Sequence, residues 1–132
     1  FVNPLLEKYA KQIKGDSILY IKELKEVLAP HGINDWYVCV IEHVVRLGEI
    51  RIARSKGNKK EADRLRKLHI IEYNCVLIPL LEKKILEYEK NRVKYPTFES
   101  YLPVLIQFLH NLTPLIIKDQ LLEYSSQKGN PG

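Results

Sequence analysis

The stretch that decides the fold is residues 35–56, DWYVCVIEHVVRLGEIRIARSK, which contains no turn signal for about twenty residues. The β-branched residues in YVCVIEHVV would also permit a strand, but so long an uninterrupted run suits a helix better. Asn34 or Asp35 can cap its start, and Gly57-Asn58 supplies a turn at its end. The inner row follows helical spacing and consists of Trp36, Val40, Val44 and Leu47.

Capping residues, prolines and glycines divide the rest of the chain into further helices. We expect an N-terminal helix from Asn3-Pro4 to Gly15 and a second, capped by Asp16 or Ser17, that ends before Pro30. The remaining ones are expected at residues 59–73, 80–92, 97–110 and 114–124, with a break before Pro79. Thr97 and Thr113 are the expected N-caps of the last two. The sequence therefore predicts an all-α fold: one domain of six or seven helices over residues 1–124, followed by a polar tail at residues 125–132.

Length and composition are typical of a single globular domain. The chain has 132 residues, of which 45% are hydrophobic and 28% charged. No apolar run approaches the roughly 20 residues that span a bilayer, so we expect a soluble, cytoplasmic protein without a membrane partner. The chain begins at Phe1 and has no methionine, which predicts a piece of a longer protein, and its Lys, Glu, Ile and Tyr content leans towards a thermophile.

Positive charge is concentrated in residues 46–67, RLGEIRIARSKGNKKEADRLRK. Nine Lys and Arg residues face three carboxylates there, a net charge of +6 in a chain whose total is +5. A basic surface on one hairpin of an otherwise balanced domain is typical of a polyanion binder. The alternative is a solvated helical hairpin whose charges only keep the protein soluble.

No constellation for catalysis or metal binding stands out. The aspartates are isolated, so a two-metal polymerase centre is not expected. No two histidines are at ligand spacing, and Cys39 with His43 is the only such pair, too few ligands to predict a metal site. His43 and His110 lie in apolar stretches, where we expect them to be half-buried. Cys39 and Cys75 are each embedded in an apolar run and are expected to be buried and free. Two cysteines cannot hold a four-thiolate iron–sulfur cluster, so we expect no cofactor.

Arg64 and His69 match a loose Arg-x4-His pattern, which resembles the active site of the HEPN-domain ribonucleases. Those are small all-α domains in which the arginine and histidine act on RNA across a dimer interface. The polar residue that usually follows the arginine is absent here, since Leu65 occupies its place. The resemblance implies an alternative function as a ribonuclease.

Residues 31–50, HGINDWYVCVIEHVVRLGEI, resemble the C-terminal domain of archaeal and eukaryotic primase large subunits. In that family a turn like Gly32-Ile33-Asn34 opens a long apolar helix that ends near a second glycine, here Gly48. The family domain is helical, binds the initiating nucleotide and the template, and holds a four-cysteine cluster that this chain cannot have. A helical, cluster-free relative resembles the noncatalytic small subunits of crenarchaeal primase, the PriX family. The phosphate-contacting histidine and arginine of the large-subunit family do not match, because Asp35 and Val38 stand in their places.

This resemblance and the basic hairpin together predict an accessory subunit of a DNA primase. Its expected partners are the catalytic and large primase subunits, single-stranded DNA template and a nucleoside triphosphate. The residues expected to hold phosphates are Arg46, Arg51, Arg54, Lys56, Lys60, Arg64 and Lys67, and those expected to contact base or sugar are Asn34, Asp35, Trp36 and Tyr37. A protein-interaction module that uses apolar residues near 95–105 is the alternative from another class.

Overall fold

The long helix α4, Trp36–Ser55, is the central element of a computed structural model that describes residues 2–127, with side chains from Pro4 onward. The Asp35 carboxylate accepts a hydrogen bond of 2.8 Å from the Val38 N–H, so Asp35 is the N-cap, as the sequence predicts. The predicted inner row is buried, and three further side chains extend it to a broad face. They are Cys39, His43 and Ile50.

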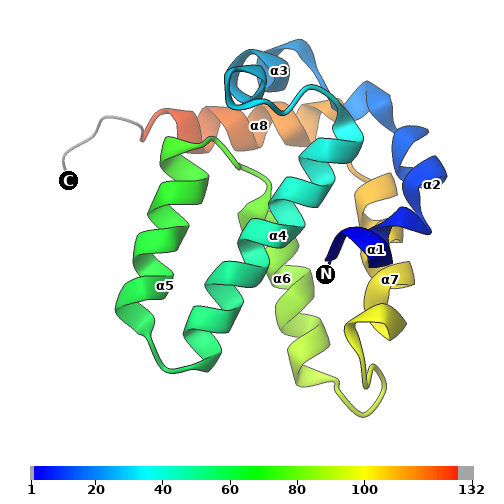
Figure 1. Cartoon of the computed structure of the whole chain (residues 1–132). Coiled ribbons are helices and arrows are strands. Elements are labelled where there is room, and N and C mark those ends of the chain that lie inside the picture. Colours follow the sequence, from blue (N-terminus) through cyan, green and yellow to red (C-terminus); the bar gives the residue numbers. More distant parts are fainter. Residues whose placement is uncertain (1, 128–132) are drawn as a thin grey trace.

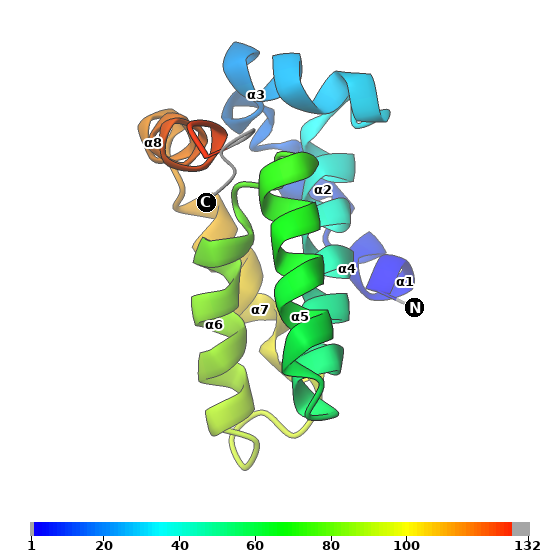
Figure 2. The same ribbon diagram turned by 90° about the vertical axis from the view of Figure 1, so that its left-hand side faces the viewer.

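Helices α5, Lys59–Arg66, and α6, Ile78–Lys90, run beside α4 (Figures 1 and 2). The turn into α5 is at Gly57-Asn58, as predicted: Gly57 adopts a φ of +76°, which glycine tolerates, and the Asn58 side chain accepts a hydrogen bond from the Glu61 N–H. α5 continues into a π-helical turn, Lys67–Glu72. Asn74 then takes a φ of 60°, and the break predicted before Pro79 follows.

The N-terminal third differs from the prediction of two helices. The first is divided into α1, Val2–Glu7, and α2, Ala10–Lys14, although no helix breaker lies between them. The reason is tertiary: α1 packs on α4, whereas α2 packs on α4 and also on α7, so the two pieces need different directions.

The second predicted helix also begins later than expected. A single 3₁₀ turn, Ser17–Leu19 (η1), precedes α3, Lys22–Leu28, and another, Ala29–His31 (η2), follows it. Asp16 does not cap a helix, because its carboxylate binds His110 instead. As a result Ile18 is 75% exposed, while Leu19 is buried.

The C-terminal helices are α7, Phe98–His110, and α8, Pro114–Ser125. Thr97 and Thr113 cap them through the Ser100 and Ile116 N–H groups, as predicted. α3 and α8 lie across one end of the bundle of α4, α5, α6 and α7, while the α4–α5 turn lies at the opposite end (Figure 1).

The all-α prediction is therefore confirmed, with eight α-helices and no strand in residues 2–127. The expected polar tail at residues 125–132 lies largely outside the described residues, because these end at residue 127. A single hydrophobic core contains side chains from every α-helix, and its largest members, Trp36 and Tyr101, are fully buried. Both cysteines are free and buried, as expected.

Candidate nucleic-acid interface

The cations of the α4–α5 hairpin fall into two groups, those held by carboxylates and those left free. Arg51 belongs to the first. Its guanidinium donates to both oxygens of Glu89 at 2.6 and 2.9 Å, and it lies 3.5 Å from Glu82. Arg66 donates to the same Glu82 at 2.5 Å. Since Glu82 is only 12% exposed and Arg51 18%, this cluster joins α4, α5 and α6 and does not present a free phosphate-binding group.

Two more hairpin cations are paired on the surface of α5. Arg64 contacts Glu61 at 2.5 Å and Lys59 contacts Asp63 at 3.0 Å. Both pairs are exposed, and such pairs exchange readily with solvent because their net contribution is small. Arg64 therefore remains accessible to a ligand, whereas Arg51, expected to hold a phosphate, is committed to Glu82 and Glu89.

Four cations of the hairpin are exposed and form no ion pair with any residue in 2–127: Arg54, Lys56, Lys60 and Lys67. Arg54 and Lys56 lie beside the Gly57 turn, Lys60 lies in the first turn of α5, and Lys67 begins the π-helical turn at the other end of α5. When Glu42, Glu82 and Glu89 are included, nine cations face six carboxylates, a net charge of +3 instead of +6. The positive surface is real but smaller than the sequence indicates.

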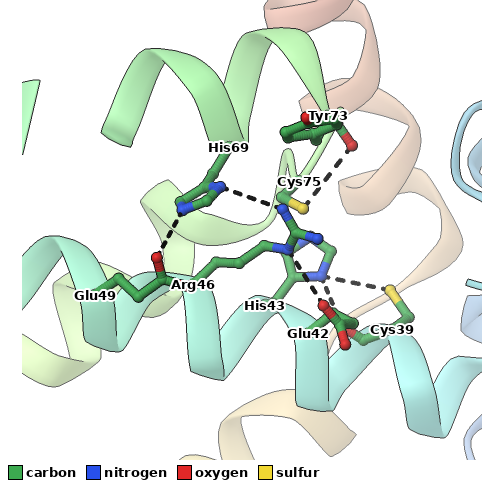
Figure 3. A network of polar contacts seen from close by, with 8 residues as sticks. All are labelled: Cys39, Glu42, His43, Arg46, Glu49, His69, Tyr73 and Cys75. Carbon is green, nitrogen blue, oxygen red and sulfur yellow. Dashed lines mark hydrogen bonds and ion pairs between the residues drawn. The ribbon is translucent and has the colours of Figure 1, made fainter. Parts of the chain in front are cut away.

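Arg46, the remaining expected phosphate contact, lies in a half-buried polar network between α4 and the π-helical turn (Figure 3). Its Nε donates to Glu42 at 3.3 Å, and its guanidinium carbon lies 5.2 Å from the centre of the Tyr73 ring. Its Nη1 is 3.2 Å from Nδ1 of His69. A guanidinium only donates, so Nδ1 of His69 accepts and the proton of the neutral ring sits on Nε2, 3.5 Å from Glu49.

Burial controls the ionisable groups of this network. It lowers the pKa of His69, with Arg46 acting in the same direction and Glu49 against it. His43 is fully buried beside Cys39, and burial lowers its pKa to about 4. Burial also raises the pKa of the Cys75 thiol to about 11 and that of Cys39 well above its usual value. His43 and His69 are therefore neutral at pH 7, and both thiols are protonated.

The residues expected to contact base or sugar lie at the other end of α4. Asp35 is occupied as the N-cap, and Trp36 is 1% exposed. The expectation that Trp36 contacts base or sugar is therefore wrong, because its ring is part of the core. Tyr37 is half-buried with the Lys14 ammonium 5.1 Å from its ring centre, and Asn34 is exposed. From residue 35 to residue 54 is about 28 Å along the helix, so the two halves of the expected site do not meet.

The pair that suggested a ribonuclease has its two members in different surroundings, although the Arg64 charge lies near enough to help lower the pKa of His69. Arg64 lies on the exposed side of α5 with Glu61, while His69 is buried against Arg46 and Glu49 of α4. The apolar residues expected to bind a protein partner near 95–105 are core residues in large part. Tyr101, Leu102 and Leu105 are buried.

Sequence reasoning missed the polar contacts that join distant parts of the chain, such as the contact between His110 and Asp16. Nδ1 of His110 lies 3.0 and 3.1 Å from the two carboxylate oxygens of Asp16. The ring is exposed, whereas His110 was expected to be half-buried. No local signal links two residues 94 positions apart. In residues 2–127 no group of three or more His, Cys, Asp or Glu side chains is arranged to hold a metal ion.

Comparison with known families assigns the chain to a domain family. Residues 1–108 match the model of a domain family described as "Domain of unknown function (DUF4932)". The chain belongs to this DUF4932 family. The match ends before α8. No curated protein and no solved structure matches the chain significantly.

The described helices were also compared with the length and hydropathy that a bilayer requires. No single one meets the requirement. α7 and α8 meet it together, as a pair bent by 92°.

Proposed function

We propose that this DUF4932 domain is a noncatalytic accessory module that binds the phosphate backbone of single-stranded nucleic acid through its α4–α5 hairpin. The observation that carries the proposal is the set of four exposed, unpaired cations, Arg54, Lys56, Lys60 and Lys67. Arg64 joins them when it releases Glu61. Catalysis would belong to a partner protein.

The chemistry of this set determines the expected mode of binding. Three of the four free cations are lysines, which act as point charges on flexible stems and do not read base edges bidentately. With about four phosphates neutralised on a single strand, log K should fall with log salt at a slope of about −3. Binding should be weak, salt-sensitive and largely independent of sequence.

The resemblance of residues 31–50 to primase large subunits gives this proposal a specific form: an accessory subunit that helps a primase hold its template. The structure changes the residues assigned to that role. The nucleotide contacts assigned to Trp36 and Asp35 are withdrawn, because the first is buried and the second caps α4. The proposed contribution is therefore to the template, and the initiating nucleoside triphosphate is left to the partner subunits.

The test is fluorescence anisotropy of a labelled single-stranded oligonucleotide, titrated at several salt concentrations. The variant Lys56→Ala/Lys60→Ala/Lys67→Ala should bind at least tenfold more weakly at low salt, with a slope near −1. The matched control, Lys22→Ala/Lys83→Ala/Lys90→Ala, removes the same charge from exposed lysines of α3 and α6 and should lose much less affinity. Equal losses in the two triple variants would mean that only net charge matters, and the hairpin would not be the interface.

A further inference from the structure

One face of α8 is exposed although it carries large apolar side chains. Leu115 and Leu122 are 67% and 66% exposed. They are seven residues apart, so they lie on the same face of the helix, and Lys118 and Asp119 lie between them at the intervening positions. The opposite face, with Ile117 and Leu121, is buried against the core.

The order of these four residues is self-complementary. Residues 115 and 122 are equally far from the midpoint between 118 and 119, and Lys118 and Asp119 flank that midpoint directly. If a second α8 packs antiparallel about a two-fold axis through the midpoint, each Leu115 meets the other chain's Leu122. Each Lys118 then meets the other chain's Asp119. An isologous dimer requires this kind of self-matching patch.

We propose that α8 is a self-association surface, and that its partner is a second copy of this chain in antiparallel packing. Charge complementarity supports this occupant. Asp119 makes no ion pair within residues 2–127, and Lys118 reaches only Glu23, at 3.8 Å. Both are therefore available to a partner with the opposite charge in the opposite place. A partner whose surface carries charge of a single sign would attract either Lys118 or Asp119 and repel the other.

The dimer would leave the α4–α5 turn, with Arg54, Lys56 and Lys60, unobstructed; of the four free cations only Lys67 lies near α8, in a pocket with Tyr124 and Gln127. α8 crosses one end of the bundle, and the hairpin turn lies at the far end (Figure 1). Ile18, which is 75% exposed in η1, borders the same end of the molecule, since η1 packs against α8. This inference does not depend on nucleic-acid binding and goes beyond it.

The contact is small. α8 has 12 residues and is about 18 Å long, so the buried area falls in the range of weak interfaces. We expect a dissociation constant on the order of 100 µM. Sedimentation velocity of the wild-type chain from roughly 10 µM to roughly 1 mM should show the shift from monomer to dimer. A chain that stays monomeric over this range would overturn the proposal.

Two single charge reversals test the pairing itself. Lys118→Asp places two carboxylates opposite two carboxylates in the dimer, and Asp119→Lys places four ammonium groups together. Each variant alone should self-associate at least tenfold more weakly than the wild type. A mixture of the two should restore dimers, because the carboxylates at positions 118 and 119 of the first variant then meet the ammonium groups at positions 119 and 118 of the second.

The control for net charge is Lys83→Asp, which changes an exposed lysine of α6 by the same amount and should dimerise as the wild type does. Circular dichroism should show that each variant is folded, since Lys118→Asp also removes the weak contact with Glu23. A variant-free measurement is the concentration dependence of wild-type amide NMR shifts, which should centre on residues 115–122. If both charge-reversal variants dimerise as the wild type does, or if the chemical-shift changes centre outside residues 115–122, self-association uses another surface and the inference is refuted.

Discussion

Glu82 is the carboxylate that contacts two of the hairpin's five arginines, and its replacement by glutamine is the most informative single change. Arg51 and Arg66 converge on it from α4 and α5 at 3.5 and 2.5 Å. Glu82→Gln keeps the size of the side chain and removes its charge. Two guanidiniums then share a half-buried space in which Glu89 holds Arg51 and the more exposed Asp63 lies near Arg66.

The expected loss of stability follows from the exposure of the partners. Removing one member of a fully buried ion pair costs roughly 3–5 kcal/mol, and an exposed pair contributes less than about 1 kcal/mol. Glu82 is 12% exposed, but Arg66 is 38% exposed and Arg51 keeps its bidentate contact with Glu89. We therefore expect Glu82→Gln to lower the free energy of unfolding by about 1–3 kcal/mol, equivalent to a fall in Tm of roughly 3–15 °C for a domain of this size.

Urea denaturation followed by circular dichroism at pH 7 measures this loss. The control is Glu87→Gln on the same helix. The Glu87 side chain is 45% exposed and contacts Lys84 at 3.1 Å, so its replacement should lower the free energy of unfolding by about 0.5 kcal/mol or less. The released Arg66 should also strengthen binding to single-stranded DNA, whereas Arg51 stays with Glu89. A variant as stable as Glu87→Gln would refute the conclusion that Glu82 neutralises the hairpin from within.

Two further predictions concern buried side chains of α4. Trp36→Ala should lower the free energy of unfolding by about 3–5 kcal/mol because of the cavity it leaves. In the wild type, acrylamide should quench Trp36 fluorescence only weakly, and DNA binding should leave the fluorescence unchanged. A change on DNA binding would mean that the ring is accessible. The pKa of His43 is about 4 in the folded chain and about 6.5 when unfolded, so the unfolded state binds the extra proton between these values. Stability should then fall by up to about 3 kcal/mol as the pH falls from about 6.5 to about 4, and an NMR titration in which the His43 ring protonates near pH 6.5 would contradict this.

Local signals in the sequence predicted a large part of the fold. A cap is decided by a side chain and an N–H group three residues later, so Asp35, Thr97 and Thr113 could be assigned without knowledge of the tertiary structure. The turn at Gly57 is equally local, since few residues other than glycine adopt its positive φ. These positions fix where four of the helices begin or end.

The prediction failed where the packing partner was distant in sequence. Nothing within residues 3–15 indicates that the first half packs mainly on α4 and the second half on both α4 and α7, yet this difference divides the helix. Asp16 has the chemistry of an N-cap, but His110, which lies at the end of α7, competes for the same carboxylate. Tertiary contacts override propensity in both cases.

Charge shows the same limit at the candidate site. A count along the chain gives residues 46–67 a net charge of +6, because the carboxylates that neutralise Arg51 and Arg66 belong to α6 and are counted elsewhere. The arginines, which the sequence favoured as phosphate ligands, are largely used to join helices. What remains for a ligand is mainly lysine at the turn and at the two ends of α5. A surface of this composition is suited to a flexible polyanion that needs no fixed geometry, and for this reason we propose a single-stranded backbone as its ligand and assign no base recognition to it.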